Sequence, residues 1–185
     1  MRKTTLLSCL FLLHGTLTGC APAFIAAGAG AGYLATHESS RHKVQRFFHD
    51  LSRSIKQTTR KVYDEQRTSQ QINYEQSRGF VLKISKVSLS PVTVGKGGKV
   101  KLIVEYVILG GPEQGVKIEE KQTLLCNGEE LTVLNNESTT KENGTWEDTL
   151  TFAVPDSAES GKYVVVQEMK AQGITRSTRR SFTVK

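Results

Sequence analysis

Hydrophobic residues recur along this chain with two different periods, each confined to its own stretch. Between residues 44 and 62 they follow alternating steps of four and three residues, the spacing of one face of an α-helix. From residue 80 onward apolar and polar residues alternate, which is typical of strands that bury one side. The pattern therefore predicts a helical segment followed by a β-rich domain.

The helical pattern lies in residues 37–78, a basic amphipathic segment. Ser39 or Ser40 can serve as the N-cap, and Gly79 provides a stop. We predict a helix over 41–66, with a weaker helical pattern and a linker up to residue 78. The apolar stripe consists of Val44, Phe47, Phe48, Leu51, Ile55, Thr58 and Val62.

The opposite face of this predicted helix is strongly basic. A basic amphipathic helix is suited to lie on anionic lipid headgroups. Its apolar stripe could equally pack on the following domain, or on a second copy as a short coiled coil. The sequence leaves these three alternatives open. The basic residues are Lys43, Arg46, Arg53, Lys56, Arg60 and Lys61.

Residues 79–185 read as about seven strands separated by turns, the pattern of a β-sandwich. Gly95-Lys96-Gly97-Gly98 and Gly110-Gly111-Pro112 are turn sequences. Asn127-Gly128 between two apolar runs is the strongest hairpin signal, because a type I′ turn needs positive φ at both residues. The predicted fold class is therefore mainly β, an antiparallel sandwich preceded by a helix.

The N-terminus has the features of a secretory leader. Met1-Arg2-Lys3 is a positive n-region, and Leu6 to Leu13 is an apolar stretch too short to span a bilayer. Leu17-Thr18-Gly19-Cys20 then resembles the lipobox of bacterial lipoproteins. The resemblance implies a signal peptide over 1–19, diacylglycerol on Cys20, and a further acyl chain such as palmitate on the new N-terminus. Ala21 resembles the residue that follows the lipid-bearing Cys in outer-membrane lipoproteins.

Residues 20–36 form an uncharged stretch built mainly of Gly and Ala. It predicts a membrane-proximal tether. Gly28 and Gly32 have the spacing at which two helices approach closely in a membrane, so self-association through this stretch is the alternative.

The strand pattern of residues 79–185 resembles immunoglobulin-like domains. Glu159-Ser160-Gly161-Lys162-Tyr163 is similar to the start of their strand F, where the Tyr forms a hydrogen-bonded corner. Val165 stands where the family has its second Cys, and Trp146 falls in the predicted strand E. The resemblance therefore implies a relative without the disulfide of that family. Cleavage would remove Cys9 and lipidation would modify Cys20, so no internal disulfide is expected in the mature chain unless Cys20 stays unmodified.

Net charge disfavours a nucleic-acid partner. The chain carries +7, but residues 79–185 hold fourteen Lys and Arg against thirteen Asp and Glu, so the predicted domain is close to neutral. Residues 37–78 hold nine against five and contain most of the excess. Arg176, Arg179 and Arg180 form a small basic group that gives weak support for an acidic partner.

Catalytic and metal-binding patterns are weak. Residues 79–185 contain no His, which excludes a Ser-His-Asp or Cys-His arrangement inside that domain. His42 and His49 lie seven residues apart on the predicted helix, but a zinc site needs three or four ligands. Glu119-Glu120 and Glu129-Glu130 are interpreted as solvated edge charges. We expect no catalytic, cofactor or metal site, and interpret Asn136 and Asn143, which match the N-glycosylation sequon, as turn residues.

Taken together, these patterns predict a non-enzymatic envelope protein, anchored through lipidated Cys20, that presents its β-domain to an unidentified protein partner. The alternative is a structural component that self-associates through the Gly-rich tether and the helix. Periplasmic or surface-exposed orientation stays open.

Overall fold

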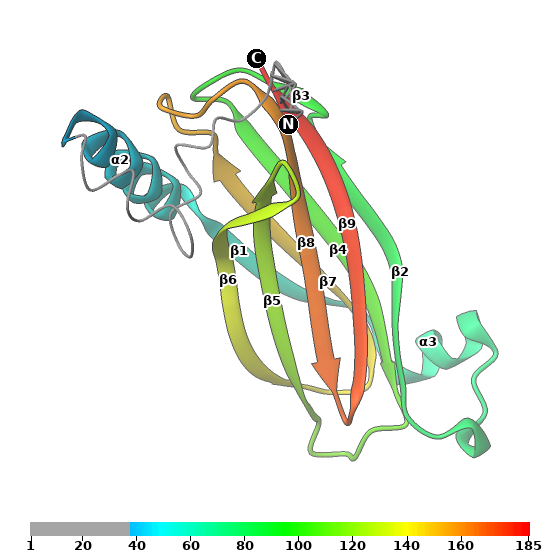
Figure 1. Cartoon of the computed structure of the whole chain (residues 1–185). Coiled ribbons are helices and arrows are strands. Elements are labelled where there is room, and N and C mark those ends of the chain that lie inside the picture. Colours follow the sequence, from blue (N-terminus) through cyan, green and yellow to red (C-terminus); the bar gives the residue numbers. More distant parts are fainter. Residues whose placement is uncertain (1–37) are drawn as a thin grey trace, which may run out of the picture.

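The structure is a computed structural model that describes residues 38–185 (Figure 1). The predicted signal peptide, lipobox and Gly/Ala tether lie outside the described residues. The described chain contains two α-helices, one short 3-10 helix and nine strands. In chain order they are α2 (Glu38–Ser54), β1 (Lys56–Tyr63), α3 (Glu65–Ile72), η2 (Gln76–Arg78), β2 (Val81–Ser90), β3 (Thr93–Val94), β4 (Lys99–Leu109), β5 (Val116–Cys126), β6 (Glu129–Lys141), β7 (Gly144–Ala153), β8 (Gly161–Ala171) and β9 (Ile174–Val184).

Two sheets face each other and form a β-sandwich, which confirms that the chain is mainly β. The four-stranded sheet has the order β1-β7-β4-β2, and the five-stranded sheet has the order β3-β9-β8-β5-β6. Neighbouring strands are antiparallel except for the short β3, which runs parallel to β9. The chain passes from one sheet to the other at β3, β4, β5, β7 and β8, and the core lies between the two sheets.

In each long strand, the apolar residues of the alternating pattern point into this core. On β4 the buried residues Val100, Leu102 and Val104 lie opposite Phe152, Leu150 and Asp148 of β7. Asp148 is thus a charged residue among paired positions that are otherwise buried and apolar.

The predicted helix over 41–66 is wrong beyond Ser54. Residues Lys56–Tyr63 form β1, an edge strand of the sandwich that pairs with β7 along its whole length. β-branched Thr58, Thr59 and Val62 favour a strand over a helix, and pairing with β7 supplies the hydrogen bonds. The sandwich therefore starts at Lys56 and not at residue 79.

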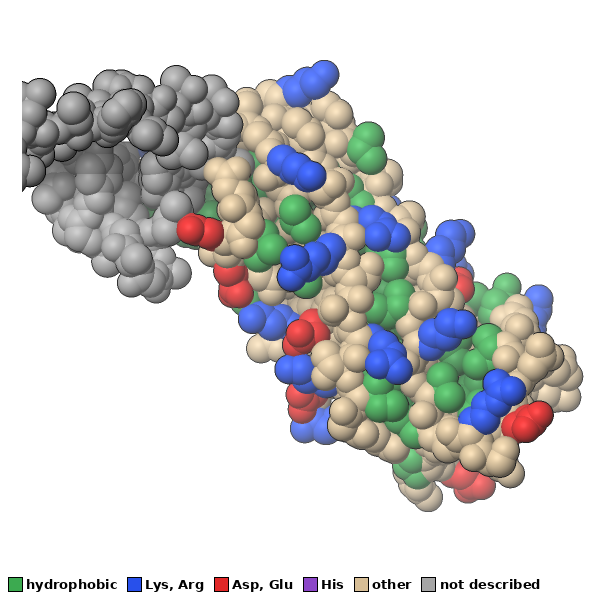
Figure 2. Space-filling view, turned by 45° about the vertical axis from the view of Figure 1, so that its right-hand side comes forward, with side chains coloured by type: hydrophobic (Ala, Val, Ile, Leu, Met, Phe, Trp, Pro, Cys, Tyr) green, Lys and Arg blue, Asp and Glu red, His purple; other side chains and the backbone are tan. Residues whose placement is uncertain are grey.

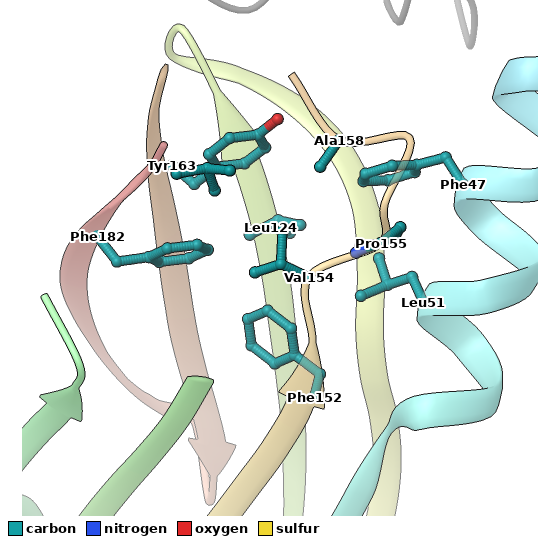
Figure 3. Close-up of a pocket in the computed structure, with 10 residues that line it drawn as sticks. Phe47, Leu51, Leu124, Phe152, Val154, Pro155, Ala158, Tyr163 and Phe182 are labelled. Carbon is teal, nitrogen blue, oxygen red and sulfur yellow. The ribbon is translucent and has the colours of Figure 1, made fainter. Parts of the chain in front are cut away.

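Helix α2 packs its apolar side on one end of the sandwich. Phe47 and Leu51 are only 1% and 2% exposed, and they lie against Pro155, Ala158 and the end of β7 (Figure 3). The space left between them is only about 10 Å³, so the joint is closely filled. Of the three alternatives for the apolar stripe, packing on the following domain is the one that the structure adopts for these two residues.

Helix α3 lies at the other end of the molecule, against the outer face of the four-stranded sheet (Figure 1). Asp64 caps it by accepting a hydrogen bond from the Arg67 backbone N–H at 2.8 Å. Thr68 is fully buried and shares a 2.9 Å hydrogen bond with Thr145 of β7. The two helices thus mark opposite ends of the sandwich.

The predicted hairpin at Asn127-Gly128 is confirmed, with φ angles of 53° and 86° that suit a type I′ turn. Cys126, immediately before it, is half-buried. No helix among the described residues is long and apolar enough to cross a membrane.

Candidate functional site

Four polar side chains meet in the interior of the sandwich and form what we call the ion cluster: Tyr106, Glu120, Lys141 and Asp148. They come from four successive long strands, β4, β5, β6 and β7, so both sheets contribute. Glu120 is 0%, Asp148 2% and Lys141 4% exposed. Three ionisable groups are thus enclosed in a region that otherwise consists largely of apolar side chains.

Lys141 is the centre of the ion cluster. Its Nζ donates to Glu120 Oε1 and to the Tyr106 hydroxyl, and lies 3.5 Å from Asp148 Oδ1. The Tyr106 hydroxyl donates to Glu120 Oε1 at 3.1 Å. Thr59 donates to Asp148 Oδ1 at 2.6 Å. Strand β1, which forms where a helix was predicted, therefore also contacts the ion cluster.

Strand alternation explains why Glu120 is inside. Residue 120 shares the inward face of β5 with Ile118 and Leu124, whereas Glu119 points outward and is exposed. The interpretation of Glu119-Glu120 as a pair of solvated edge charges is therefore wrong for Glu120. β5 lies between β6 and β8, so its inward face is covered and it is not an edge.

Burial changes the protonation of these groups. Burial, followed by the nearby Asp148, raises the pKa of Glu120 to about 8, against the opposing effect of Lys141. Burial also raises the pKa of Tyr106 well above its usual range, followed by the charges of Asp148 and Glu120. Glu120 Oε2 and Asp148 Oδ2 are both buried and have no other hydrogen-bond partner among the described residues.

The raised pKa of Glu120 predicts that stability depends on pH. Between the ordinary value of 4.5 and about 8, the folded chain binds more protons than the unfolded chain, so stability falls as pH rises through this window. We expect the free energy of unfolding, measured with urea, to decrease from about pH 5 to about pH 8 and the slope to be smaller in Glu120→Gln. An equally steep profile in Glu120→Gln would contradict this assignment.

A second feature lies on the surface, where β2 and β9 run side by side; we call it the basic seam. It consists of Lys83, Lys86, Arg176, Arg179 and Arg180, all exposed. Figure 2, which turns the β2 and β9 side forward, shows Lys and Arg side chains spread over this face and fewer acidic ones. The sequence indicated only the three arginines. The contact between β2 and β9 places Lys83 and Lys86 on the same side of the molecule.

Two arginines of the basic seam also tie the sheets together. Arg176 Nε donates to the Leu82 carbonyl at 2.9 Å, and Arg180 donates to the Val87 carbonyl at 3.3 Å. Both carbonyls belong to β2, an edge strand, so these arginines occupy acceptors that another strand could otherwise use.

The remaining predicted residues are scattered. His42 and His49 are exposed on α2, and His49 Nδ1 lies 3.2 Å from Asp50 Oδ1. The part of the chain that the structure describes contains no group of three or more His, Cys, Asp and Glu that could hold a metal ion. Asn143 is buried in the β6–β7 turn and exchanges hydrogen bonds with Gly111, as expected for a turn residue. Cys20, Gly28 and Gly32 lie outside the described residues.

Sequence reasoning missed Lys141 and Asp148 altogether. A signal was present at β7 and just after it: Trp146, Leu150, Phe152 and Val154 occupy alternate positions in the sequence, and the gap in that series is residue 148. A charged residue at an inward position of an alternating strand indicates a buried partner of opposite charge.

No family model and no curated protein matches this chain. Solved structures are similar to it in fold alone. They include the sporulation control protein Spo0M of Bacillus subtilis (19% identity, TM-score 0.40, over 56% of this chain and 49% of that one). A Niemann-Pick type C2 protein from the Japanese carpenter ant has 11% identity and TM-score 0.41 over 57% and 93%. A conjugative transposon lipoprotein from Bacteroides eggerthii has 21% identity and TM-score 0.32 over 56% and 95%. This chain thus spans about half the length of Spo0M.

Proposed function

We propose that this protein is a non-enzymatic, lipid-anchored envelope protein that presents an immunoglobulin-like sandwich to an acidic protein partner. The anchor is Cys20 of the predicted lipobox, and the outer membrane is its proposed location. The mechanism is tethering: the lipid holds the chain, α2 connects the tether to the sandwich, and the basic seam binds the partner.

Two features support the immunoglobulin-like assignment. Strands β2, β4 and β7 in one sheet, and β5, β8 and β9 in the other, lie in the order of strands A, B and E against C, F and G. β1 takes the edge place of strand D, although it comes first in the chain. The Tyr163 hydroxyl donates to the Glu159 carbonyl at 3.0 Å at the start of β8, the geometry of a tyrosine corner. Burial raises the pKa of Tyr163 to about 12, so this hydroxyl keeps its proton for the bond.

Helix α2 supports the tethering part of the proposal. Because Phe47 and Leu51 are buried against the sandwich, the chain reaches the domain at a fixed place at one end. The polar side of α2 with Lys43, Arg46 and Arg53 stays exposed next to the predicted tether. A basic surface near an anionic membrane would hold the sandwich close to it.

The basic seam is the observation that carries the choice of partner. Its five cations come from β2 and β9, which belong to different sheets and run side by side; Arg176 and Arg180 also bond to the backbone of β2. An acidic surface would match it, and complementary charge raises the rate and specificity of association.

The test is capture of the full-length protein, with bound partners, from its own envelope. We expect the wild type to recover a reproducible acidic protein, and Lys83→Glu with Arg179→Glu to reduce that recovery by about tenfold. The matched control reverses two exposed lysines elsewhere, Lys117→Glu with Lys162→Glu, and should retain the partner.

Cys20→Ser serves as the control for the anchor and should move the protein from the membrane to the soluble fraction. Equal recovery with both double variants would contradict binding at the basic seam. Unchanged membrane attachment of Cys20→Ser would contradict the lipid anchor.

A further inference from the structure

We propose that Lys141 and Asp148 become joined by an amide bond between Lys141 Nζ and Asp148 Cγ, formed inside the folded sandwich with Glu120 carrying the proton. The product is an internal cross-link between β6 of the five-stranded sheet and β7 of the four-stranded sheet. This modification is independent of the proposed partner and of the lipid anchor.

The geometry separates the roles of the two carboxyl groups. Glu120 contacts Lys141 Nζ directly, so it is placed to accept a proton from the amine. Asp148 Oδ1 lies 3.5 Å from the same nitrogen, within the range from which an attack on the neighbouring carbon can start. Glu120 is therefore the proton acceptor and Asp148 the group that is attacked.

Donors already surround the oxygen on which negative charge would develop. Thr59 donates to Asp148 Oδ1 at 2.6 Å, and this bond polarises the carboxyl group and stabilises an oxyanion. Asp148 Oδ2, which is buried and has no hydrogen-bond partner among the described residues, is the oxygen that leaves.

Lys141 is enclosed by two carboxyl groups and two aromatic rings. Besides being buried with Glu120 and Asp148, Lys141 Nζ lies 5.0 Å from the centre of the Tyr106 ring and 5.8 Å from that of Trp146. Where water is excluded, proton transfer from an ammonium to a carboxylate yields two neutral groups and avoids the cost of two buried charges. The neutral amine is the nucleophile.

The reaction balances without an oxidant or any further reactant. The Lys141 ammonium gives one proton to Glu120, and its nitrogen lone pair forms a bond to Asp148 Cγ. Glu120 passes that proton to Oδ2, a second proton of the nitrogen follows by the same route, and the Cγ–Oδ2 bond breaks. An ammonium and a carboxylate thereby become an amide and one water molecule, and Glu120 returns to its starting state.

The test is peptide mass spectrometry of the full-length protein after unfolding, reduction, alkylation and digestion with trypsin. An amide at Lys141 blocks cleavage there, so we expect a single peptide covering residues 122–162, lighter by the mass of one water molecule. Cleavage of a single backbone bond between residues 141 and 148 should release no fragment ions, because the amide still holds the two fragments together. Two ordinary peptides ending at Lys141 and Lys162 would overturn the proposal.

Variants identify the groups involved. Lys141→Arg and Asp148→Ala should abolish the loss of water, and Glu120→Gln should reduce the cross-linked fraction at least tenfold; circular dichroism of each variant confirms that it folds. The matched control is Glu168→Gln, which removes the exposed ion pair between Lys170 and Glu168 at 3.0 Å and should leave the cross-link complete. Loss of water that persists in Asp148→Ala, or an amide that joins Lys141 to Glu120, would overturn the assignment.

Discussion

Replacing Lys141 by Met is expected to lower the free energy of unfolding by about 3–5 kcal/mol, a large part of the stability of a domain of this size. The side chain of Met fills a similar volume, so this loss arises from charge and hydrogen bonding, and the absence of the proposed amide bond adds to it. Glu120 and Asp148 would remain buried with no cation between them. Urea unfolding at neutral pH, followed by circular dichroism, measures the change.

The reasoning behind this expectation also predicts a rescue. If the cost comes from two carboxyl groups left without their cation, then Glu120→Gln and Asp148→Asn added to Lys141→Met should recover much of the lost stability. The control is Lys170→Met, which breaks an exposed ion pair with Glu168 and should change stability far less. A triple variant no more stable than Lys141→Met would contradict the electrostatic explanation.

Replacing Phe47 by Ala is expected to cost about 3 kcal/mol, because the ring fills the joint between α2 and the end of the sandwich. The phenyl group is almost completely buried, and the joint contains little empty space into which neighbours could collapse. Urea unfolding measures the loss. We also expect faster cleavage by trypsin at Arg53, because α2 would detach more often from the sandwich.

Gln45→Ala is the matched control for Phe47→Ala. Gln45 is exposed on the same helix, and its replacement should leave both the unfolding curve and the rate of cleavage unchanged. If Phe47→Ala were cleaved no faster than the wild type, α2 would not depend on this contact for its position.

Strand β1 shows the limit of reading periodicity. Its inward residues Gln57, Thr59 and Lys61 are all polar, and each donates a hydrogen bond to an acidic side chain: Glu137, Asp148 and Glu142. A strand whose inward side is polar has no apolar alternation to reveal it. Ile55, Thr58 and Val62 meanwhile continued the helical spacing of α2 by coincidence, so the predicted helix extended too far.

The basic residues of the predicted helix lie on two different elements, because the helix ends at Ser54 and β1 follows it. Lys43, Arg46 and Arg53 lie on α2, whereas Arg60 and Lys61 lie on β1 and form ion pairs with Glu147 at 2.8 Å and Glu142 at 2.7 Å. The Arg60 side chain keeps the pKa of Glu147 below its usual range. The sequence predicted one continuous basic surface. In the structure, two of its cations are paired with acidic residues of the sandwich.

Local patterns in the sequence determined the β-sandwich class, most of the strands and the turn at Asn127-Gly128, because alternation and turn residues act over a few positions. Only the tertiary structure decided that β1 joins the sandwich, that Phe47 and Leu51 seal its end, and that Lys83 and Lys86 lie beside the arginines of β9. It alone brought Glu120, Lys141 and Asp148 together, because they come from three strands in two sheets. Contacts between facing sheets depend on how distant segments pair, and no short-range pattern records that pairing.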